Sequence, residues 1–261
     1  MKLKIYQVDA FTDELFSGNP AAVIPLLNDW LDDTIMQKIA LENNLAETAF
    51  YILKGGLCHI RWFTPEIEVD LCGHATLATG FVLFEYENYP KDIIKFKSKS
   101  GILSIKKNRD FLTLNFPADV IQKIELNNEL KDCFDIEPVE AYKGKTDYML
   151  VYENEEQIKS IKYDLTKISK VKSRGIIITA PGKTVDFVSR FFAPQSGIIE
   201  DPVTGSAHTT LVPYWTKILN KTELTAKQLS KRQGFLKCKY LKNRVEISGK
   251  AILYLKGEIN I

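Results

Sequence analysis

The spacing of apolar residues divides the first half of the chain into short strands and two helices. Alternation of apolar and polar residues predicts strands at residues 4–10, 21–26, 48–53, 59–63, 93–96, 101–106 and 111–116. Apolar residues at helical spacing predict an amphipathic helix over residues 29–44. Residues 74–85 are apolar nearly all round, which predicts a helix buried in the middle of a domain.

The second half repeats this order. Strands are predicted at residues 140–142, 147–152, 175–180, 185–192, 236–240, 244–248 and 251–258. Helix is predicted over residues 155–172, with a break near Asp164, and residues 206–219 predict a second helix that is apolar all round. The polar segment 119–137 is the predicted linker between the halves. We therefore predict an α+β protein with an internal duplication: one domain over residues 1–118 and a similar one over residues 119–261, with the final strand free to return to the first domain.

A short motif occurs once in each half. In the first half Gly73-His74 opens the buried helix, and in the second Gly205-Ser206 follows the acidic residue Asp201. Each copy predicts a strand, a tight glycine turn and a helix start, where free N–H groups and the positive end of the helix dipole can bind an anion. Two such starts facing each other would form a site for a carboxylate or a phosphate. The alternative is two ordinary helix starts in a duplicated fold.

Composition and charge narrow the class of protein. Apolar residues make up 45% of the chain and charged residues 26%, as in ordinary soluble globular proteins. The formal charge is +2, from 35 basic and 33 acidic residues. This balance lacks the excess of positive charge that is typical of proteins that bind nucleic acid or an anionic membrane. The chain lacks a run of about 18 apolar residues, which argues against a transmembrane helix.

Two further features of the sequence indicate where in the cell the protein is expected. The N-terminal sequence predicts a strand and has no apolar signal segment, so we do not expect secretion. The four cysteines are widely spaced and lack a CxxC pair, so we expect free thiols in a reducing cytoplasm: Cys58, Cys72, Cys133 and Cys238.

Side chains able to transfer protons lie near both motif copies. Glu47 stands between a predicted helix end and a strand, among apolar neighbours that would desolvate its carboxylate and favour the protonated form. On residues alone, a surface carboxylate is the favoured interpretation. His74 at a helix start is disfavoured as a cation, which predicts a neutral imidazole. Asp201 is a candidate partner acid, Ser206 alone would be interpreted as a helix cap, and His208 as a packed helix residue.

Other chemistries do not fit the spacing. Cys58-His59 and Cys72 with His74 are zinc ligand types, but neighbouring strand residues face opposite ways and a four-ligand spacing is lacking, so we expect no metal. The sequence has neither a phosphate loop nor a GxGxxG motif for a dinucleotide. It also lacks the Gly-x-Ser-x-Gly motif of serine hydrolases.

Five segments in this order resemble the PhzF family of phenazine-biosynthesis-like proteins. They are residues 7–11 (QVDAF), 18–23 (GNPAAV), 44–50 (NLAETAF), 71–76 (LCGHAT) and 201–208 (DPVTGSAH). The resemblance implies the diaminopimelate-epimerase-like fold, with two pseudo-symmetric domains, each a β-barrel-like sheet wrapped around a central helix. It also implies an active site in the cleft between the domains and a homodimer.

The resemblance further implies a reaction. Members with known chemistry move a proton within a small carboxylic acid without metal or organic cofactor, and the best understood isomerises trans-2,3-dihydro-3-hydroxyanthranilate. By this resemblance Glu47 is the general acid and base, while His74, Asp201 and Ser206 bind substrate and assist the transfer. The LCGH form of the first motif belongs to a broad part of the family, so phenazine synthesis itself is not implied.

The resemblance implies further substrate contacts, and two other functions stay open. Backbone amides near Gly73 and Gly205 would hold the substrate carboxylate, with Asn19 and Cys72 beside them. The related amino-acid epimerases use two cysteines, whereas here only the first turn has a thiol. A racemase or epimerase of an amino or hydroxy acid that uses Cys72 is therefore the alternative, and a non-catalytic dimeric binding protein is the third hypothesis.

Overall fold

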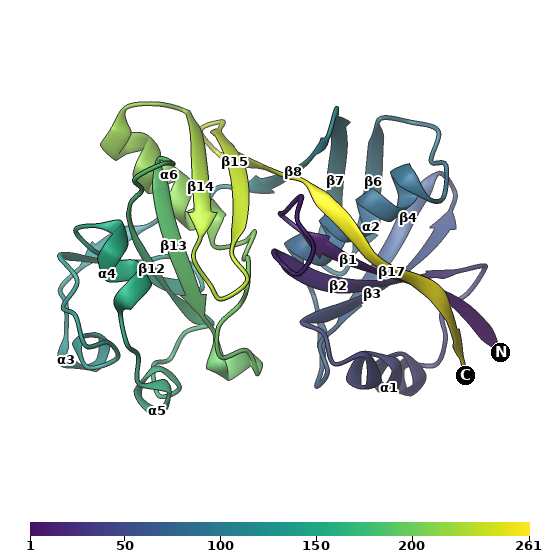
Figure 1. Cartoon of the computed structure of the whole chain (residues 1–261), viewed down its shortest axis with the longest axis horizontal. Helices are drawn as coiled ribbons and strands as arrows, with labels where there is room; N and C mark the ends of the chain where they lie inside the picture. The colour runs from purple at the N-terminus through teal and green to yellow at the C-terminus, as the bar shows by residue number, and fades with distance from the viewer. The chain divides into compact units, whose positions relative to one another are not determined.

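The computed structural model describes residues 1–261, apart from the side chain of Ser196. Contacts within the chain divide it into two compact units. Unit 1 comprises Met1–Asn115 and Ser248–Ile261, and unit 2 comprises Phe116–Ile247. Each unit has strands, helices and buried apolar side chains of its own, and each is described by itself (Figure 1).

Unit 1 is built from nine strands and two helices. These are β1 (Lys2–Ala10), β2 (Asn19–Leu26), β3 (Glu47–Lys54), β4 (Leu57–Phe63), β5 (Glu68–Val69), β6 (Ile93–Ser98), β7 (Gly101–Asn108), most of β8 (Phe111–Pro117) and β17 (Ala251–Asn260), with α1 (Asp33–Asn43) and α2 (Gly73–Glu85). Strand β1 pairs antiparallel with both β2 and β17, so the two chain ends lie side by side (Figure 1). Both β1 and β2 were predicted as strands from the sequence.

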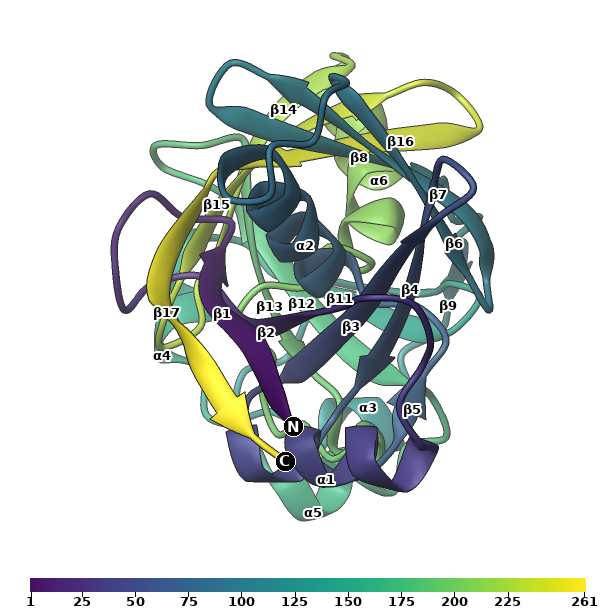
Figure 2. The same cartoon turned by 90° about the vertical axis from the view of Figure 1, so that its right-hand side faces the viewer.

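Helix α2 is the centre of unit 1. Ten of its residues are buried, as its apolar sequence predicted, and it packs against β1, β2 and β3 (Figure 2). On the side of β7 it presents Gly80, where a Cβ atom would lie only 2.7 Å from Cδ1 of Ile105. The lack of a side chain at Gly80 therefore lets the helix approach this strand closely.

Helix α1 determines where β3 begins. It starts at Asp33 rather than at residue 29, because the carboxylate of Asp32 accepts a hydrogen bond of 2.9 Å from the Thr34 amide and caps the helix. It ends at Asn43, and the next residue, Asn44, has the left-handed conformation with φ of 48°. The chain then turns directly into β3, whose first residue is Glu47.

Unit 2 contains the remaining elements. They are β9 (Gln122–Ile124), β10 (Glu140–Lys143), β11 (Asp147–Val151), β12 (Gly175–Pro181), β13 (Phe187–Phe192), β14 (Glu223–Gln228), β15 (Gly234–Tyr240) and most of β16 (Arg244–Gly249), with α3 (Asn128–Lys131), α4 (Glu155–Ser160), α5 (Leu165–Ile168), the 3₁₀ turn η1 (Pro194–Ser196) and α6 (His208–Leu219). Strands β11 and β12 run parallel, and β12 pairs antiparallel with β13.

Helix α6 is the counterpart of α2, but the prediction of an all-round apolar helix over residues 206–219 is wrong in two respects. The helix begins at His208, and its C-terminal turn is open to solvent, with Ile218 54% exposed. Its buried side packs against β14 and β15, and the indole N–H of Trp215 donates a hydrogen bond of 3.0 Å to Thr179 of β12. The helix therefore needs an apolar surface on one side only.

Other features also differ from the predictions. The predicted linker contains β9 and α3, and strands β5 and β14 were not predicted. Within the described residues, the structure contains no helix that is long and apolar enough to cross a membrane.

Candidate active site

Glu47 is a buried carboxylate in unit 1. As the first residue of β3, it pairs with Ala21 of the parallel strand β2. Only 10% of its side chain is exposed. The interpretation of Glu47 as a surface carboxylate, which the residues alone favoured, is therefore wrong, because the turn after α1 carries it into the sheet.

His74, the second residue of α2, points its ring at this carboxylate. Its Nε2 lies 3.1 Å from Oε2 of Glu47, and 5% of its side chain is exposed. The distance is that of an ion pair, but neither atom has a hydrogen-bond partner of good geometry among the described residues. Catalytic hydrogen bonds often become well aligned only when a substrate binds. The pair therefore keeps hydrogen-bonding capacity for a bound molecule.

The other nitrogen of the His74 ring faces two different residues. Nδ1 lies 3.1 Å from Nδ2 of Asn19 and 3.6 Å from Sγ of Cys72. With the amide in this orientation Asn19 donates and Nδ1 accepts, which places the ring proton on Nε2, toward Glu47. The amide turned over would instead offer its oxygen to a doubly protonated ring. Asn19, Glu47, Cys72 and His74 thus form one buried group, with Gly73 as the first residue of α2.

Two neighbours, Cys72 and Glu47, raise the pKa of His74. Burial lowers the pKa of His74, but Cys72 and Glu47 together raise it further, so that it lies well above the ordinary 6.5. Burial also raises the pKa of the Cys72 thiol to about 11, which leaves the thiol neutral at pH 7. The neutral imidazole expected from the helix start is wrong, because that argument did not include these two neighbours.

Three residues of this group are also metal-ligand types. One ligand atom each from Glu47, Cys72 and His74 lies within 4.8 Å of the other two. The two nitrogens of the His74 ring face different residues, since Nε2 faces Glu47 and Nδ1 faces Cys72. A single ion could bind only one of these nitrogens, together with the thiol and the carboxylate. The group therefore has the residue types of a metal site as well as those of a proton relay.

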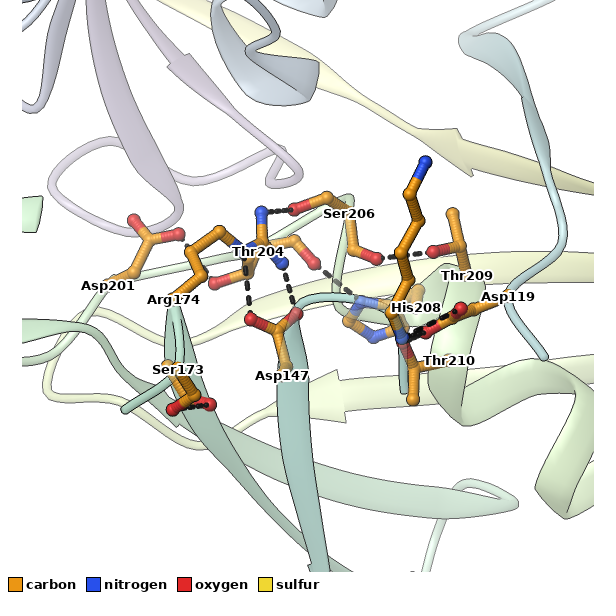
Figure 3. A network of polar contacts seen from close by, with 12 residues as sticks. Asp119, Asp147, Ser173, Arg174, Asp201, Thr204, Ser206, His208, Thr209 and Thr210 are labelled. Carbon is orange, nitrogen blue, oxygen red and sulfur yellow. Dashed lines mark hydrogen bonds and ion pairs between the residues drawn. The ribbon is translucent and has the colours of Figure 1, made fainter. Parts of the chain in front are cut away.

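The second motif lies in unit 2, in the loop before α6 (Figure 3). Asp201 is 7% exposed, and its carboxylate accepts a hydrogen bond from the hydroxyl of Thr204. Gln228, at the end of β14, binds this loop through two hydrogen bonds. Its Nε2 donates to the carbonyl of Asp201 at 2.7 Å, and its Oε1 accepts from the amide of Thr204 at 2.8 Å. The Asp201 carboxylate is therefore fixed by the loop that carries it.

Ser206 is held by an arginine that the sequence analysis did not single out. Arg174 Nη1 donates a hydrogen bond of 2.8 Å to the Ser206 hydroxyl, while its Nε and Nη2 bind both oxygens of Asp147 (Figure 3). Asp147 begins β11 and Arg174 immediately precedes β12, and the parallel pairing of these strands brings them together. Burial lowers the pKa of Arg174, but Asp147, with smaller effects of Asp201 and Asp119, raises it further, so the guanidinium stays charged.

The two motif copies do not match in detail. Helix α2 starts at Gly73, whereas Gly205, Ser206 and Ala207 form a turn before α6. The amide of His208 donates to the carbonyl of Gly205 at 3.1 Å within this turn. The Ser206 side chain is used in the contact with Arg174 and is not the helix cap that residues alone suggested. Only the first copy is therefore a glycine at a true helix start.

Comparison with known proteins identifies close relatives over the full length. A family model described as "phenazine biosynthesis-like protein" (PhzC-PhzF) matches residues 8–257. A Pseudomonas aeruginosa protein named as an uncharacterized isomerase is 47% identical over 262 residues, which covers 100% of both chains. The crystal structure of a PhzF-family protein from Enterococcus faecalis has a TM-score of 0.97 at 46% identity, again covering 100% of both chains.

The fold also occurs in epimerases. A hydroxyproline epimerase from Agrobacterium vitis, solved with bound trans-4-hydroxy-L-proline, has a TM-score of 0.63 at 7% identity and covers 99% of this chain and 92% of its own. At this identity the likeness concerns the fold alone. Together with the strands packed around α2 and α6, it confirms the epimerase-like α+β class expected from the sequence.

Proposed function

Because the chain belongs to the PhzF family of phenazine-biosynthesis-like proteins, we propose that it is an isomerase that moves a proton within a small carboxylic acid, with Glu47 removing and returning the proton. The observation that carries the proposal is the buried contact between Glu47 and His74, at 3.1 Å. A carboxylate screened from water and paired with a titratable imidazole is suited to general acid–base catalysis.

The proposed reaction balances without a further reactant. The Glu47 carboxylate takes a proton from a carbon atom next to a conjugated group, and the electron pair of the broken C–H bond is delocalised into the substrate. The protonated Glu47 then returns the proton to a different carbon atom. Charged His74 stabilises the electron-rich intermediate between these steps, because its positive charge lies in a site with little water.

Substrate binding is the second part of the proposal. The free amides at the start of α2, including that of Gly73, would bind the substrate carboxylate, with Asn19 beside them. Asp201 and Ser206 would bind polar groups of the same substrate. Repetition of the motif in both halves of the sequence supports this shared role, and the expected cleft between the domains belongs to the proposal.

The reaction is proposed to need neither metal nor organic cofactor. Support comes from the proton cycle on Glu47, which is complete without a further reactant. Activity should therefore survive dialysis against EDTA. A loss that Zn²⁺ or another divalent ion restores would contradict this part of the proposal.

Exchange of substrate protons with solvent tests the role of Glu47. A mixture of small carboxylic acids that includes trans-2,3-dihydro-3-hydroxyanthranilate is incubated in D₂O and followed by NMR. Wild-type protein should remove the C–H signal of at least one compound, and Glu47→Gln should abolish this exchange, because an amide cannot carry the proton. Glu42→Gln, which alters an exposed carboxylate of α1, is the matched control and should exchange normally.

Two outcomes would count against the proposal. Normal exchange by Glu47→Gln would exclude Glu47 as the proton carrier. The failure of wild-type protein to exchange any compound of the mixture would favour the binding-protein hypothesis. The homodimer that the family resemblance implies is also proposed, and sedimentation equilibrium would test it through the mass of the assembly.

A further inference from the structure

The contact between Arg174 and Ser206 fixes the direction of the Ser206 hydroxyl. A guanidinium can only donate hydrogen bonds, so the oxygen of Ser206 accepts the 2.8 Å bond from Nη1. The proton of the hydroxyl must then point elsewhere. Within the described part of the chain, no residue accepts a hydrogen bond from this O–H. Ser206 is therefore a donor that is ready for a group outside the chain.

Arg174 itself is rigidly placed. Asp147 is 1% exposed and binds the guanidinium through both carboxylate oxygens, and the guanidinium lies 5.2 Å from the centre of the Phe191 ring. A bidentate pair and an aromatic contact together fix the plane of the guanidinium. The position of the Ser206 oxygen is thereby fixed before any ligand binds. Figure 3 shows Arg174 between Asp147 and Ser206, with Asp201 nearby.

The charge of Arg174 also strengthens the hydroxyl as a donor. An O–H whose oxygen accepts a bond from a cation becomes more polarised, so the hydrogen bond it donates is stronger, most of all to an anion. We propose that Arg174 is a positioning residue, which makes the Ser206 hydroxyl a directed donor to an anionic oxygen of the substrate. The inference rests on the proposed function, because it requires that Ser206 contacts the substrate.

A cysteine at position 206 tests the influence of Arg174 without any substrate. The four native cysteines are buried, and burial raises the pKa of each thiol, so Ser206→Cys adds a single reactive thiol. Iodoacetamide at pH 7 should alkylate it about tenfold faster than the same thiol in the Asp147→Asn/Arg174→Gln background, because a nearby cation lowers a thiol pKa by about one unit or more. Equal rates would overturn the proposal.

The Asp147→Asn/Arg174→Gln background (the paired background) removes both charges together, so neither charge remains buried without its partner. If that protein unfolds, all five thiols will react, and the stoichiometry of alkylation will reveal it. Arg174→Lys then takes its place, since lysine keeps a cation beside Asp147 but cannot bind both Asp147 oxygens and residue 206. Alkylation of Ser206→Cys should again be slower than with Arg174, and an equal rate would overturn the proposal.

A double-mutant cycle tests the effect on the reaction, with the compound that exchanges in D₂O. Ser206→Ala should lower kcat/KM roughly 10- to 100-fold when Arg174 is present, and less than about threefold in the paired background. A purely structural arginine would leave the same factor in both backgrounds, which would overturn the positioning role. If wild-type protein exchanges nothing, the proposed function fails, whereas the thiol experiment still decides the part played by Arg174.

Discussion

His208 should make the stability of unit 2 depend strongly on pH. It is the first residue of α6 and is fully buried, with its Nδ1 2.8 Å from the carbonyl of Thr204. That contact requires a proton on Nδ1, and Nε2 is a buried atom without a partner among the described residues. Burial lowers the pKa of His208 from the ordinary 6.5 to about 4, and the Thr204 carbonyl opposes this only in part.

The magnitude follows from proton linkage. In the unfolded chain His208 takes up a proton near pH 6.5, whereas in the folded protein it does so only near pH 4. Between these values the unfolded state binds more protons, so the free energy of unfolding falls as the pH falls. A difference of about 2.5 pH units, at about 1.36 kcal/mol each, makes His208 responsible for a loss of about 3 kcal/mol between pH 7 and pH 4.

Urea unfolding of wild type and His208→Asn at several pH values isolates this contribution. The Asn side chain can still donate to Thr204 but does not titrate. Trp215, which stacks on Phe187 at 5.7 Å, gives a fluorescence signal from unit 2. The variant should be less stable at pH 7, because it leaves space where the ring packed. Its free energy of unfolding should then fall by about 3 kcal/mol less than that of wild type on going to pH 4.

Other titrating groups, including His74, are common to both proteins and cancel in the difference. Curves that stay parallel from pH 7 to pH 4 would refute the reasoning. An NMR titration of the folded protein gives an independent answer, since the sequence contains only three histidines. Protonation of His208 near pH 6.5 without unfolding would mean that burial does not exclude the charged ring.

Three further outcomes are expected. Burial raises the pKa of the Cys72 thiol to about 11, so iodoacetamide at pH 8 should leave Cys72 unmodified. The variant Cys72→Ala should retain proton exchange. Rapid inactivation by iodoacetamide would instead favour the racemase. Gly249→Ala should lower the free energy of unfolding in urea by about 1–3 kcal/mol, because its Cβ would lie 2.3 Å from Cδ1 of Phe11. The control Gly257→Ala, whose Cβ would lie 3.9 Å from its nearest neighbour, should change it by less than about 0.5 kcal/mol. Gln228→Met should lower the rate of proton exchange and the free energy of unfolding, the latter by about 1–3 kcal/mol, because it removes the hydrogen bonds to the loop before α6. An unchanged unfolding midpoint would show that other contacts position this loop.

Local sequence patterns predicted most elements of the fold. Alternation identified β1, β2 and the strands around the Gly55-Gly56 turn, and the apolar run identified the buried helix α2. Strand β14 was missed although it alternates, because its buried face consists of Leu224, Ala226 and Gln228. Only one of these is a large apolar residue, so the pattern resembles a polar loop. The identity of Gln228 is explained by the loop that it binds, which local sequence does not reveal.

The sequence predicted several residues of the candidate site, but not which of them contact one another. Glu47 and His74 were selected as titratable groups, yet their contact depends on how β3 packs beside α2. That contact changes the expected charge of His74. Arg174 and Asp147 were not selected at all, because the parallel register of β11 and β12 creates their pairing. A prediction of parallel pairing would have been the one signal able to find them.

The differences between the motif copies bear on the type of reaction. From Pro65 to Gly73 is eight residues, and from Pro194 to Gly205 is eleven. The longer second loop ends in a turn before α6, where Ser206 meets Arg174 instead of beginning a helix as Gly73 does. Unit 1 thus presents the buried contact between Glu47 and His74, whereas unit 2 presents a hydroxyl bound to a guanidinium. A racemase that uses one base in each half needs equivalent groups in both copies, but a hydroxyl bound to a guanidinium is a hydrogen-bond donor and a poor base. This asymmetry suits an isomerase in which a single carboxylate both removes and returns the proton.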